Sequence, residues 1–464
     1  MTRKLEWIVV AAALSCSAGP AAAWVNHTLG AWPALAAMPE INAAPAIRVE
    51  TLDAFLAAEA RGLEQLLQRE EAWARANVPL YPPRPDALAF TPGGTPAELR
   101  QRFVAALRIN PGMKLNLFVQ ARPGDSVSGK ATLPWTEVTT RRRASAAQES
   151  VFLRLREGDR VALLDVVATA TDEPDYGMDI GLWDDNGTPY GKAYGFGKQP
   201  FGNPALEFAS QAPFHMGFFH EAAMVYKAAG FLRRTYPEYR IHLWQSLAAY
   251  ALQTAHPYWG WRFAGWALHY IEDLTQPYHA SVLPGVGVPR LLWINTLDLL
   301  GLHEPKKQAI TLVSNRHLSL ENYQYHRMRN AYARHDAGDA LVNAVKDTSA
   351  DAGRVYFADD AAREVISRES NALAGATDRV LEQSLQRKYV SDPAYVLGET
   401  EPELDLYDVL NKSPPPAREA MTGMVAGLLR NFGAHSRAFV RSLLARSQQG
   451  PGRAQRAVRS SIKD

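Results

Sequence analysis

The sequence predicts a mainly α-helical protein with a small β-containing insertion. Long segments rich in Ala, Leu, Glu and Arg carry apolar residues at the spacing of an amphipathic helix. Strand-like composition is confined to two short runs. Of the 464 residues, 47% are hydrophobic and 21% are charged, so the chain can build a large core and disorder is not expected.

The first half of the chain contains the expected insertion. Residues 24–80 have helical spacing, and a Pro-rich loop follows at 81–94. Residues 113–170 change character, because 115–120 and 150–155 are rich in β-forming residues. We therefore expect a small β insertion there, with Arg141 to Arg143 in a solvated loop between its strands.

The second half is expected to be helical after a long loop. Residues 172–214 are rich in Gly, Pro, Asp and Asn, and a loop of this length within a compact domain suggests a functional role. The helices predicted beyond it cover 220–234, 239–254, 259–274, 318–335, 361–387 and 417–446.

The two ends of the chain differ from the body in composition. Arg3 and Lys4 precede an apolar run and a small-residue stretch that ends at Ala23, which is typical of a cleaved signal peptide over residues 1–23. An uncleaved anchor, or a lipid on Cys16, is the alternative. Cleavage would leave Trp24 as the first residue of a secreted or periplasmic protein. The body is then one domain, 24–446, and residues 447–464 form a basic tail expected to be disordered.

Charge and cysteine content give no support for a nucleic-acid-binding protein or for a fold stabilised by disulfides. The chain has 50 basic and 48 acidic residues, a net charge of +2, so no nucleic-acid partner is expected. The single cysteine, Cys16, lies in the predicted signal peptide. The mature chain would therefore have no disulfide, and core burial or bound metal must stabilise it.

One histidine-rich segment has the spacing of a metal site. His269 and Asp273 are four residues apart and share a helical face. Pro277 then ends the helix and can turn His279 back towards that face. Imidazole and carboxylate are zinc ligands, and three of them leave a position for water. The alternative is a His–Asp pair that satisfies its own hydrogen bonds in a polar core.

Two further histidine pairs add candidate ligands. His317 and Glu321 are again four residues apart, at the expected start of a helix. A single pair of this kind would suggest a surface hydrogen bond. Two pairs with this spacing in one chain, His269 with Asp273 and His317 with Glu321, favour a metal site instead. His215 and His220 are five apart and would diverge by about 140° on one helix. Only one of these two is therefore expected to bind, and His215 is preferred.

These motifs resemble a known family. The segment from His269 to His279 resembles the H-x-x-x-D-x-x-x-P-x-H motif of zinc-dependent phospholipases C and of the related fungal single-strand nucleases. The pair His317 and Glu321 is similar to the H-x-x-x-E pair that follows it in the phospholipases. Those enzymes are mostly helical, hold three zinc ions, and begin with a tryptophan whose amino nitrogen and carbonyl oxygen bind metal. Trp24 matches that tryptophan.

The resemblance implies an assignment of ligands to three zinc ions. Trp24 and His27 would bind one ion together with His317 and Glu321. A second site would begin with His269, Asp273 and His215, and His279 would join a third.

The resemblance also implies a bridging aspartate upstream of His215. Asp175 is the preferred candidate, with Asp172 and Asp179 as alternatives. Two of these three carboxylates are expected to be ordinary solvated turn residues. In the family the corresponding aspartate is thought to orient or deprotonate the attacking water, so Asp175 is also the expected catalytic residue.

The chain departs from the family pattern at three points. His27 lies closer to the first residue than usual. Glu272 replaces a small residue beside Asp273 and either adds a charge near the metals or points to solvent. The gap between His279 and His317 is long and holds an apolar run, 288–302, that is either a flap touching lipid or an ordinary buried helix.

The expected activity follows from this resemblance. Bound zinc would lower the pKa of a water so that it attacks the phosphorus of a phospholipid, releasing diacylglycerol and a phosphorylated head group. Phospholipid substrate and transient membrane-surface contact are the expected interactions. A single-strand nuclease or phosphomonoesterase on the same scaffold is the first alternative, with Tyr190, Tyr194 and Phe196 as stacking candidates. A non-catalytic zinc-binding exported protein is the second.

Overall fold

The computed structural model describes residues 24–142, 145–354, 358–397, 401 and 403–448. The protein is 61% helix and 3% strand, which confirms the mainly α prediction. The predicted signal peptide, and the tail from residue 449 onward, lie outside the described residues. Within the described part of the chain, no helix combines the length and apolar character needed to cross a membrane.

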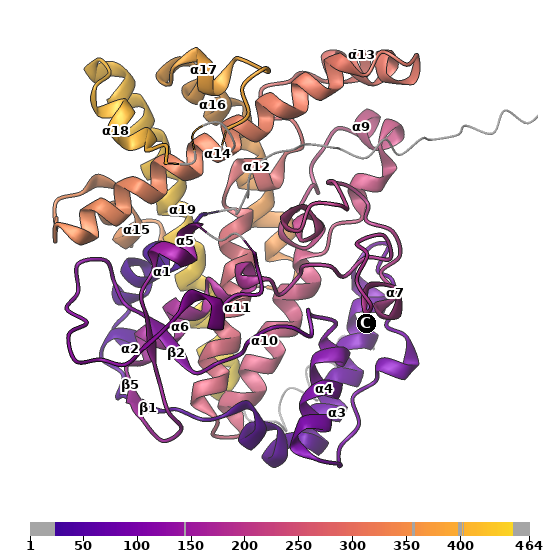
Figure 1. Ribbon diagram of the computed structural model, residues 1–464, viewed down its shortest axis with the longest axis vertical. Coiled ribbons are helices and arrows are strands. Elements are labelled where there is room, and N and C mark those ends of the chain that lie inside the picture. Colours follow the sequence, from indigo (N-terminus) through magenta and orange to yellow (C-terminus); the bar gives the residue numbers. More distant parts are fainter. Residues whose placement is uncertain (1–23, 143–144, 355–357, 398–400, 402, 449–464) are drawn as a thin grey trace, which may run out of the picture.

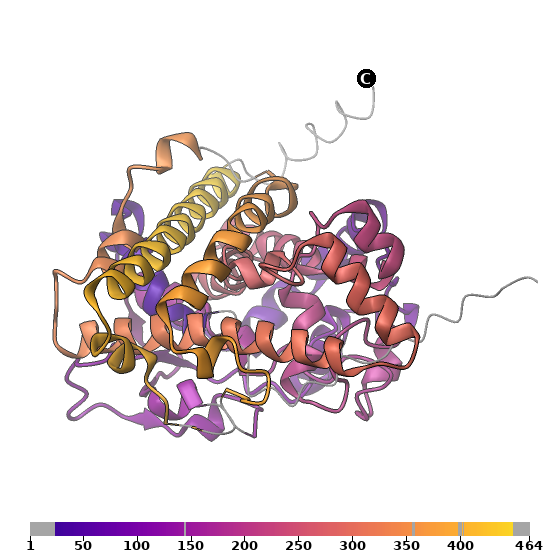
Figure 2. The ribbon, with the colours of Figure 1, turned by 90° about the horizontal axis from the view of Figure 1, so that it is seen from above.

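Helices α10 and α11 lie near the centre of the molecule, and both longer and shorter helices surround them (Figures 1 and 2). The long and medium helices are α1 (His27–Ala36), α3 (Leu52–Asn77), α4 (Pro96–Leu107), α6 (Leu163–Ala170), α10 (Pro237–Gln253), α11 (Pro257–Leu274), α13 (Val288–Leu299), α14 (Glu304–Ala333), α16 (Arg368–Ser384) and α19 (Pro415–Gln448). The short ones are α2 (Pro39–Asn42), α5 (Ser145–Glu149), α7 (Gly191–Tyr194), α8 (Ala212–His215), α9 (Ala223–Ala228), α12 (Pro277–Ala280), α15 (Ala340–Lys346), α17 (Arg387–Val390) and α18 (Leu406–Asn411).

The strands are few and short, as expected, and form two small antiparallel sheets. They are β1 (Ile47–Arg48), β2 (Phe118–Gln120), β3 (Thr132–Leu133), β4 (Phe152–Arg154) and β5 (Arg160–Val161). In the larger sheet β4 lies between β2 and β3, with Val119 opposite Leu153 and Leu133 opposite Phe152. The smaller sheet pairs β1 with β5. The two strands predicted in the insertion are therefore present and pair with each other.

Several predicted boundaries are wrong for local physical reasons. The segment 220–234 forms only α9 and one 3₁₀ turn at Gly230–Arg233. The insertion predicted over 113–170 ends earlier, because its last residues form α6, which packs its apolar side chains on α11. Helix α14 begins at Glu304, ahead of the predicted residue 318, because Pro305 fits its first turn. The predicted helix 361–387 starts with a π-helical turn, Ala362–Ser367, and ends at Ser384.

Helix α11 is the centre of the packing. Every residue from Tyr258 to Leu274 is buried, because α10, α6 and α19 cover it. Its aromatic residues interlock with α10: the rings of Trp244 and Trp266 meet edge to face, 4.8 Å apart. Gly265 lets α6 approach closely, since a Cβ there would lie 2.4 Å from Ala170 Cβ and 2.6 Å from the Val167 carbonyl oxygen.

This close approach makes Gly265→Ala a test of the fold. The added methyl must push α6 away from α11, so we expect the variant to lose about 1–3 kcal/mol of unfolding free energy in urea titrations. Gly427→Ala on α19 is the matched control, because a Cβ at that position meets nothing within 4 Å. The control should be neutral, or more stable by up to about 1 kcal/mol through helix propensity. Equal stability of the two variants would contradict the packing described.

Candidate metal centre

Helix α11 buries charged side chains that need partners. Near its start, Arg262 donates from Nε to Glu173 Oε1 at 2.8 Å and from Nη2 to Glu173 Oε2 at 2.9 Å, so the two charges are paired with each other. Near its end lie His269, Glu272 and Asp273, all fully buried. A buried carboxylate or imidazole is costly without hydrogen bonds or a counter-charge, so these three residues define the place to look for a site.

The first group of candidate ligands joins α1 to α11. It consists of His27, His269 and Asp273, whose ligand atoms lie within 4.8 Å of one another. His27 Nε2 is 3.2 Å from Asp273 Oδ1, and the imidazole rings of His27 and His269 are 4.2 Å apart. The two members on α11 are four residues apart and share one face of the helix, as their spacing predicted.

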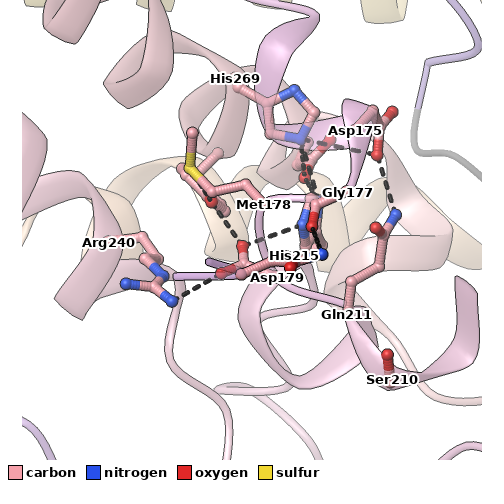
Figure 3. A network of polar contacts seen from close by, with 12 residues as sticks. Asp175, Gly177, Met178, Asp179, Ser210, Gln211, His215, Arg240 and His269 are labelled. Atoms are coloured by element: carbon pink, nitrogen blue, oxygen red, sulfur yellow. Dashed lines mark hydrogen bonds and ion pairs between the residues drawn. The ribbon is translucent and has the colours of Figure 1, made fainter. Parts of the chain in front are cut away.

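The second group adds two residues that come before α11 in the chain (Figure 3). Asp175 lies in the 3₁₀ turn Glu173–Tyr176, His215 ends α8, and both converge on His269. His269 Nε2 is 3.0 Å from His215 Nδ1 and 4.0 Å from Asp175 Oδ1. His215 Nδ1 is also 2.8 Å from Asp273 Oδ2, so the first and second groups adjoin and share His269.

The third group lies between α12 and α14. It consists of His279, His317 and Glu321. His317 Nε2 is 2.6 Å from Glu321 Oε1, and the rings of His279 and His317 are 5.0 Å apart. His279 Nδ1 lies 3.0 Å from the main-chain oxygen of His215, which places this group next to the second.

The structure thus distributes the predicted ligands differently from the assignment that the resemblance implied. His27 lies with His269 and Asp273, not with His317 and Glu321, because the start of α1 is held against α11. His317 and Glu321 lie instead with His279, which the resemblance had placed in a third site. That pair stands in the middle of α14 and not at its start.

Several buried side-chain atoms of these groups have no hydrogen-bond partner in the described part of the chain. Among the described residues, six side-chain atoms of the predicted ligands make no hydrogen bond: His27 Nε2, Asp175 Oδ2, His215 Nε2, Asp273 Oδ1, His317 Nε2 and Glu321 Oε2. Each unsatisfied buried polar atom costs about 1–3 kcal/mol. A cation between these atoms would remove that cost, and imidazole with carboxylate is the donor set of zinc. The residues present therefore fit a divalent metal.

The imidazoles of the candidate groups differ in pKa, and therefore in whether a proton must leave before metal binds. Burial lowers the pKa of His269 to about 3 and lowers the pKa of His317 well below its usual value, so both are neutral at pH 7. Burial also acts to lower the pKa of His215, but the nearby carboxylates of Asp273 and Asp179 outweigh it and raise this pKa to about 10. A metal ion must therefore displace a proton from His215.

The two alternative aspartates are buried as well, which corrects the expectation of solvated turn residues. Asp172 accepts hydrogen bonds from the His27 main-chain N–H and the Thr28 hydroxyl, both at 2.6 Å, and so fixes the start of α1. Asp179 accepts from Arg240 Nη2 at 2.6 Å and from the Tyr270 hydroxyl. Both carboxylates hold elements of the site in place, whereas Asp175 is grouped with two histidines.

Of the two histidines in the third predicted pair, only His215 joins a candidate group. His220 lies after α8, and its Nε2 is 2.7 Å from the main-chain oxygen of Arg363. The two histidines do not share a helix, so the predicted angular divergence does not apply. His215 ends α8, whereas His220 lies in the connection that precedes α9.

Glu272 and Trp24 contact the residues of the candidate groups without belonging to any group. Glu272 is fully buried; its Oε2 lies 2.9 Å from His27 Nδ1, and its Oε1 accepts from the Ser436 hydroxyl at 3.0 Å. That contact leaves the Nε2 atom of His27 to face Asp273. The Trp24 indole donates to the main-chain oxygen of Glu272 at 3.1 Å, which keeps the start of the described chain beside α11.

Sequence reasoning missed the supporting roles of Gln211 and Ser436. Gln211 Nε2 donates to Asp175 Oδ1 at 2.8 Å, and Ser436 reaches Glu272 from α19. No motif marks either residue, and Ser436 is more than 160 positions from its partner. The role of Glu272 could have been suspected from its place beside Asp273.

The opening of the site can be located from side-chain exposure. Among the nine predicted ligands, Asp175 and His317 keep the largest exposed fractions, 6% and 5%, while His27, His269, Asp273 and Glu321 have none. The candidate groups are therefore least covered at Asp175 and His317.

Comparisons with protein-family models, with curated proteins and with solved structures found no match. The family resemblance therefore remains an interpretation that depends on this chain's own residues.

The ligand groups predict which carboxylate controls metal content. Asp273→Asn should lower the zinc bound per chain, measured by elemental analysis after dialysis, because the residue lies between two groups. Asp351→Asn is the matched control: Asp351 is a buried carboxylate that accepts from Arg437 and Arg441 on α19, away from the ligand groups. The control can lose stability but should keep its metal. Equal zinc contents would contradict the site.

Metal affinity should also depend on pH. Since His215 is protonated in the metal-free protein at neutral pH, zinc binding must release protons, and affinity should fall between about pH 8 and about pH 6. Calorimetric titrations in two buffers of different ionisation enthalpy would measure the protons released. A zinc affinity that does not change with pH would contradict the ligand role of His215.

Proposed function

We propose that the protein is an exported zinc-dependent phosphodiesterase that hydrolyses phospholipids to diacylglycerol and a phosphorylated head group. The observation that supports this most is the adjacency of three His and carboxylate groups, two of which share His269. Neighbouring metal sites of this kind suit phosphoryl transfer, in which charge develops on both the attacking and the leaving oxygen. Three zinc ions and an amino-terminal Trp24 ligand belong to the same proposal.

The chemistry divides between metal and protein. Zinc bound to neutral imidazole and carboxylate would supply Lewis acidity and a water of lowered pKa. Asp175 is the proposed general base: Oδ1 is held by Gln211, and Oδ2 is buried without a hydrogen bond to any described residue. Its free oxygen can orient an attacking water and take its proton. The contact with Gln211 prevents the carboxylate from rotating away.

A cation beside this base would help to bind phosphate. Arg141 is half-buried, not fully solvated as expected, and its Nη1 donates to the main-chain oxygen of Asp175 at 3.4 Å. The guanidinium remains charged and has further donors for a phosphate oxygen. We propose that Arg141 contacts the phosphate of the substrate.

Two observations favour a phospholipid over a nucleic acid. The chain has a net charge of only +2, which gives no particular attraction for a polyanion. Stacking on bases needs exposed aromatic rings, but Tyr194 and Phe196 are 3% and 1% exposed. Arg108 stacks over Phe196, 4.0 Å from its ring centroid, and Tyr190 donates its hydroxyl to the Ile180 carbonyl. None of the three offers a free platform.

Substrate class can be tested directly. Purified protein would be assayed on phosphatidylcholine, single-stranded DNA and a phosphomonoester, with chelator and after zinc is restored. We expect lipid cleavage that disappears on chelation and returns with zinc. Turnover of DNA or of the monoester alone would replace the proposal with the alternative activity on the same scaffold. Zinc binding without turnover of any substrate would identify a non-catalytic protein.

The role of Asp175 gives a second test. Asp175→Asn should lower kcat on phosphatidylcholine by about 10²–10⁴-fold, the usual contribution of a general base, while zinc content changes less than in Asp273→Asn. Asp184→Asn is the matched control, because this aspartate is exposed in the same segment. Unchanged kcat in Asp175→Asn would exclude Asp175 as the base.

A further inference from the structure

Four of the nine large hydrophobic residues that are exposed in the described part of the chain lie on α13 and in the turn that follows it. Trp293, Leu299, Leu300 and Leu302 are 62%, 68%, 72% and 57% exposed, and together they are called the apolar tip below. Met224 on the adjoining helix α9 is also 49% exposed. A cluster of large exposed hydrophobic residues on one short segment marks an interaction surface rather than ordinary surface composition.

The tip is firmly held by the rest of the protein. The opposite face of α13 buries Leu291 and Ile294, and Leu291 packs in a cluster with Phe218 and Val225. The turn into α14 is made by Gly301, whose φ of +83° favours glycine. Asp298 braces this turn, because it accepts from Lys306 Nζ and lies beside His303 Nδ1, both at 2.7 Å. The tip is therefore presented to its surroundings by a folded support.

The surroundings of the tip suit a lipid surface. Helix α13 and the first turns of α14 lie at the edge of the molecule in both views (Figures 1 and 2), and each side chain of the tip is more than half exposed. Arg290 and Lys307 flank it, are exposed, and make no ion pair with any described residue. Leucine and tryptophan beside cations is the composition of a segment that enters the boundary between acyl chains and phosphate head groups.

We propose that the apolar tip docks the protein on a phospholipid bilayer, with its leucines and Trp293 among the acyl chains and Arg290 and Lys307 at the phosphates. The chain links this surface to the metal centre on both sides. His279 precedes α13, and α14 carries His317 and Glu321 further along the same helix. Docking at the tip would hold the third ligand group near the lipid surface. The link to catalysis depends on the proposed function, whereas the docking itself does not.

Vesicle flotation of the full chain tests the docking. The vesicles would be phosphatidylcholine alone or phosphatidylcholine with phosphatidylglycerol, and binding should be stronger on the anionic vesicles. Leu299→Ser/Leu300→Ser should reduce partitioning at least tenfold on both. Leu80→Asn is the matched control: Leu80 is 60% exposed after α3, and its φ of 56° suits asparagine. The control should bind like the parent protein.

Quenching by brominated lipid locates the contact. Bromine on the acyl chains should quench part of the tryptophan fluorescence of the parent protein, and Trp293→Phe should remove this quenching while vesicle binding is kept within a few fold. Absence of vesicle binding by the parent protein would overturn the proposal. So would tip variants that bind as well as the parent, or a tip that only joins two copies of the chain in sedimentation experiments.

Hydrolysis of a short-chain phosphatidylcholine below its micelle concentration separates this inference from the proposed function. The tip variants should hydrolyse this monomeric substrate like the parent protein but lose at least tenfold in rate on vesicles. A parent protein that binds vesicles through the tip yet hydrolyses neither form of the lipid would support docking and refute the proposed activity. Equal losses on monomer and vesicle would overturn the docking role.

Discussion

Helix α11 is buried on every side, yet its last turns carry an imidazole and two carboxylates. The cost of burying such groups has to be offset by partners that come from elsewhere in the chain. Near the start of the helix, the charge of Arg262 is paired with one carboxylate, that of Glu173. At the end of the helix the solution takes α1, α8, α12 and α14, together with unpaired atoms that suit a cation.

The buried carboxylates around these groups also need hydrogen-bond donors or counter-charges. Asp172 holds the start of α1, Asp179 joins Arg240 and Tyr270, and Glu272 contacts His27 and Ser436. Each carboxylate is buried and each has named donors, so the ligands are fixed by packing before any metal binds. These contacts limit the side-chain rotamers that the histidines can adopt. They also account for the burial of the three carboxylates.

The third candidate ligand group and the apolar tip lie on one continuous stretch of chain. His279 lies in α12, and His317 and Glu321 lie in the middle of α14. Helix α13 lies between them in the chain, and its outer face is exposed. The stretch was ambiguous in sequence, because an apolar run of this length suits both a buried helix and a lipid-facing flap. Burial argues against the ordinary buried helix, because only Leu291 and Ile294 of α13 are buried.

The sequence by itself determined the helical class, the two paired strands of the insertion and the residues that make up the ligand groups. Spacing carries this information, since residues four apart on a helix must share a face, as His269 with Asp273 and His317 with Glu321 do. Tertiary structure alone decided which groups meet: that His27 joins His269, that His279 joins His317, and that Asp175 rather than Asp172 or Asp179 is grouped with histidines. These contacts join residues up to about 250 positions apart, and no local propensity or periodicity encodes how helices so distant in the chain pack together.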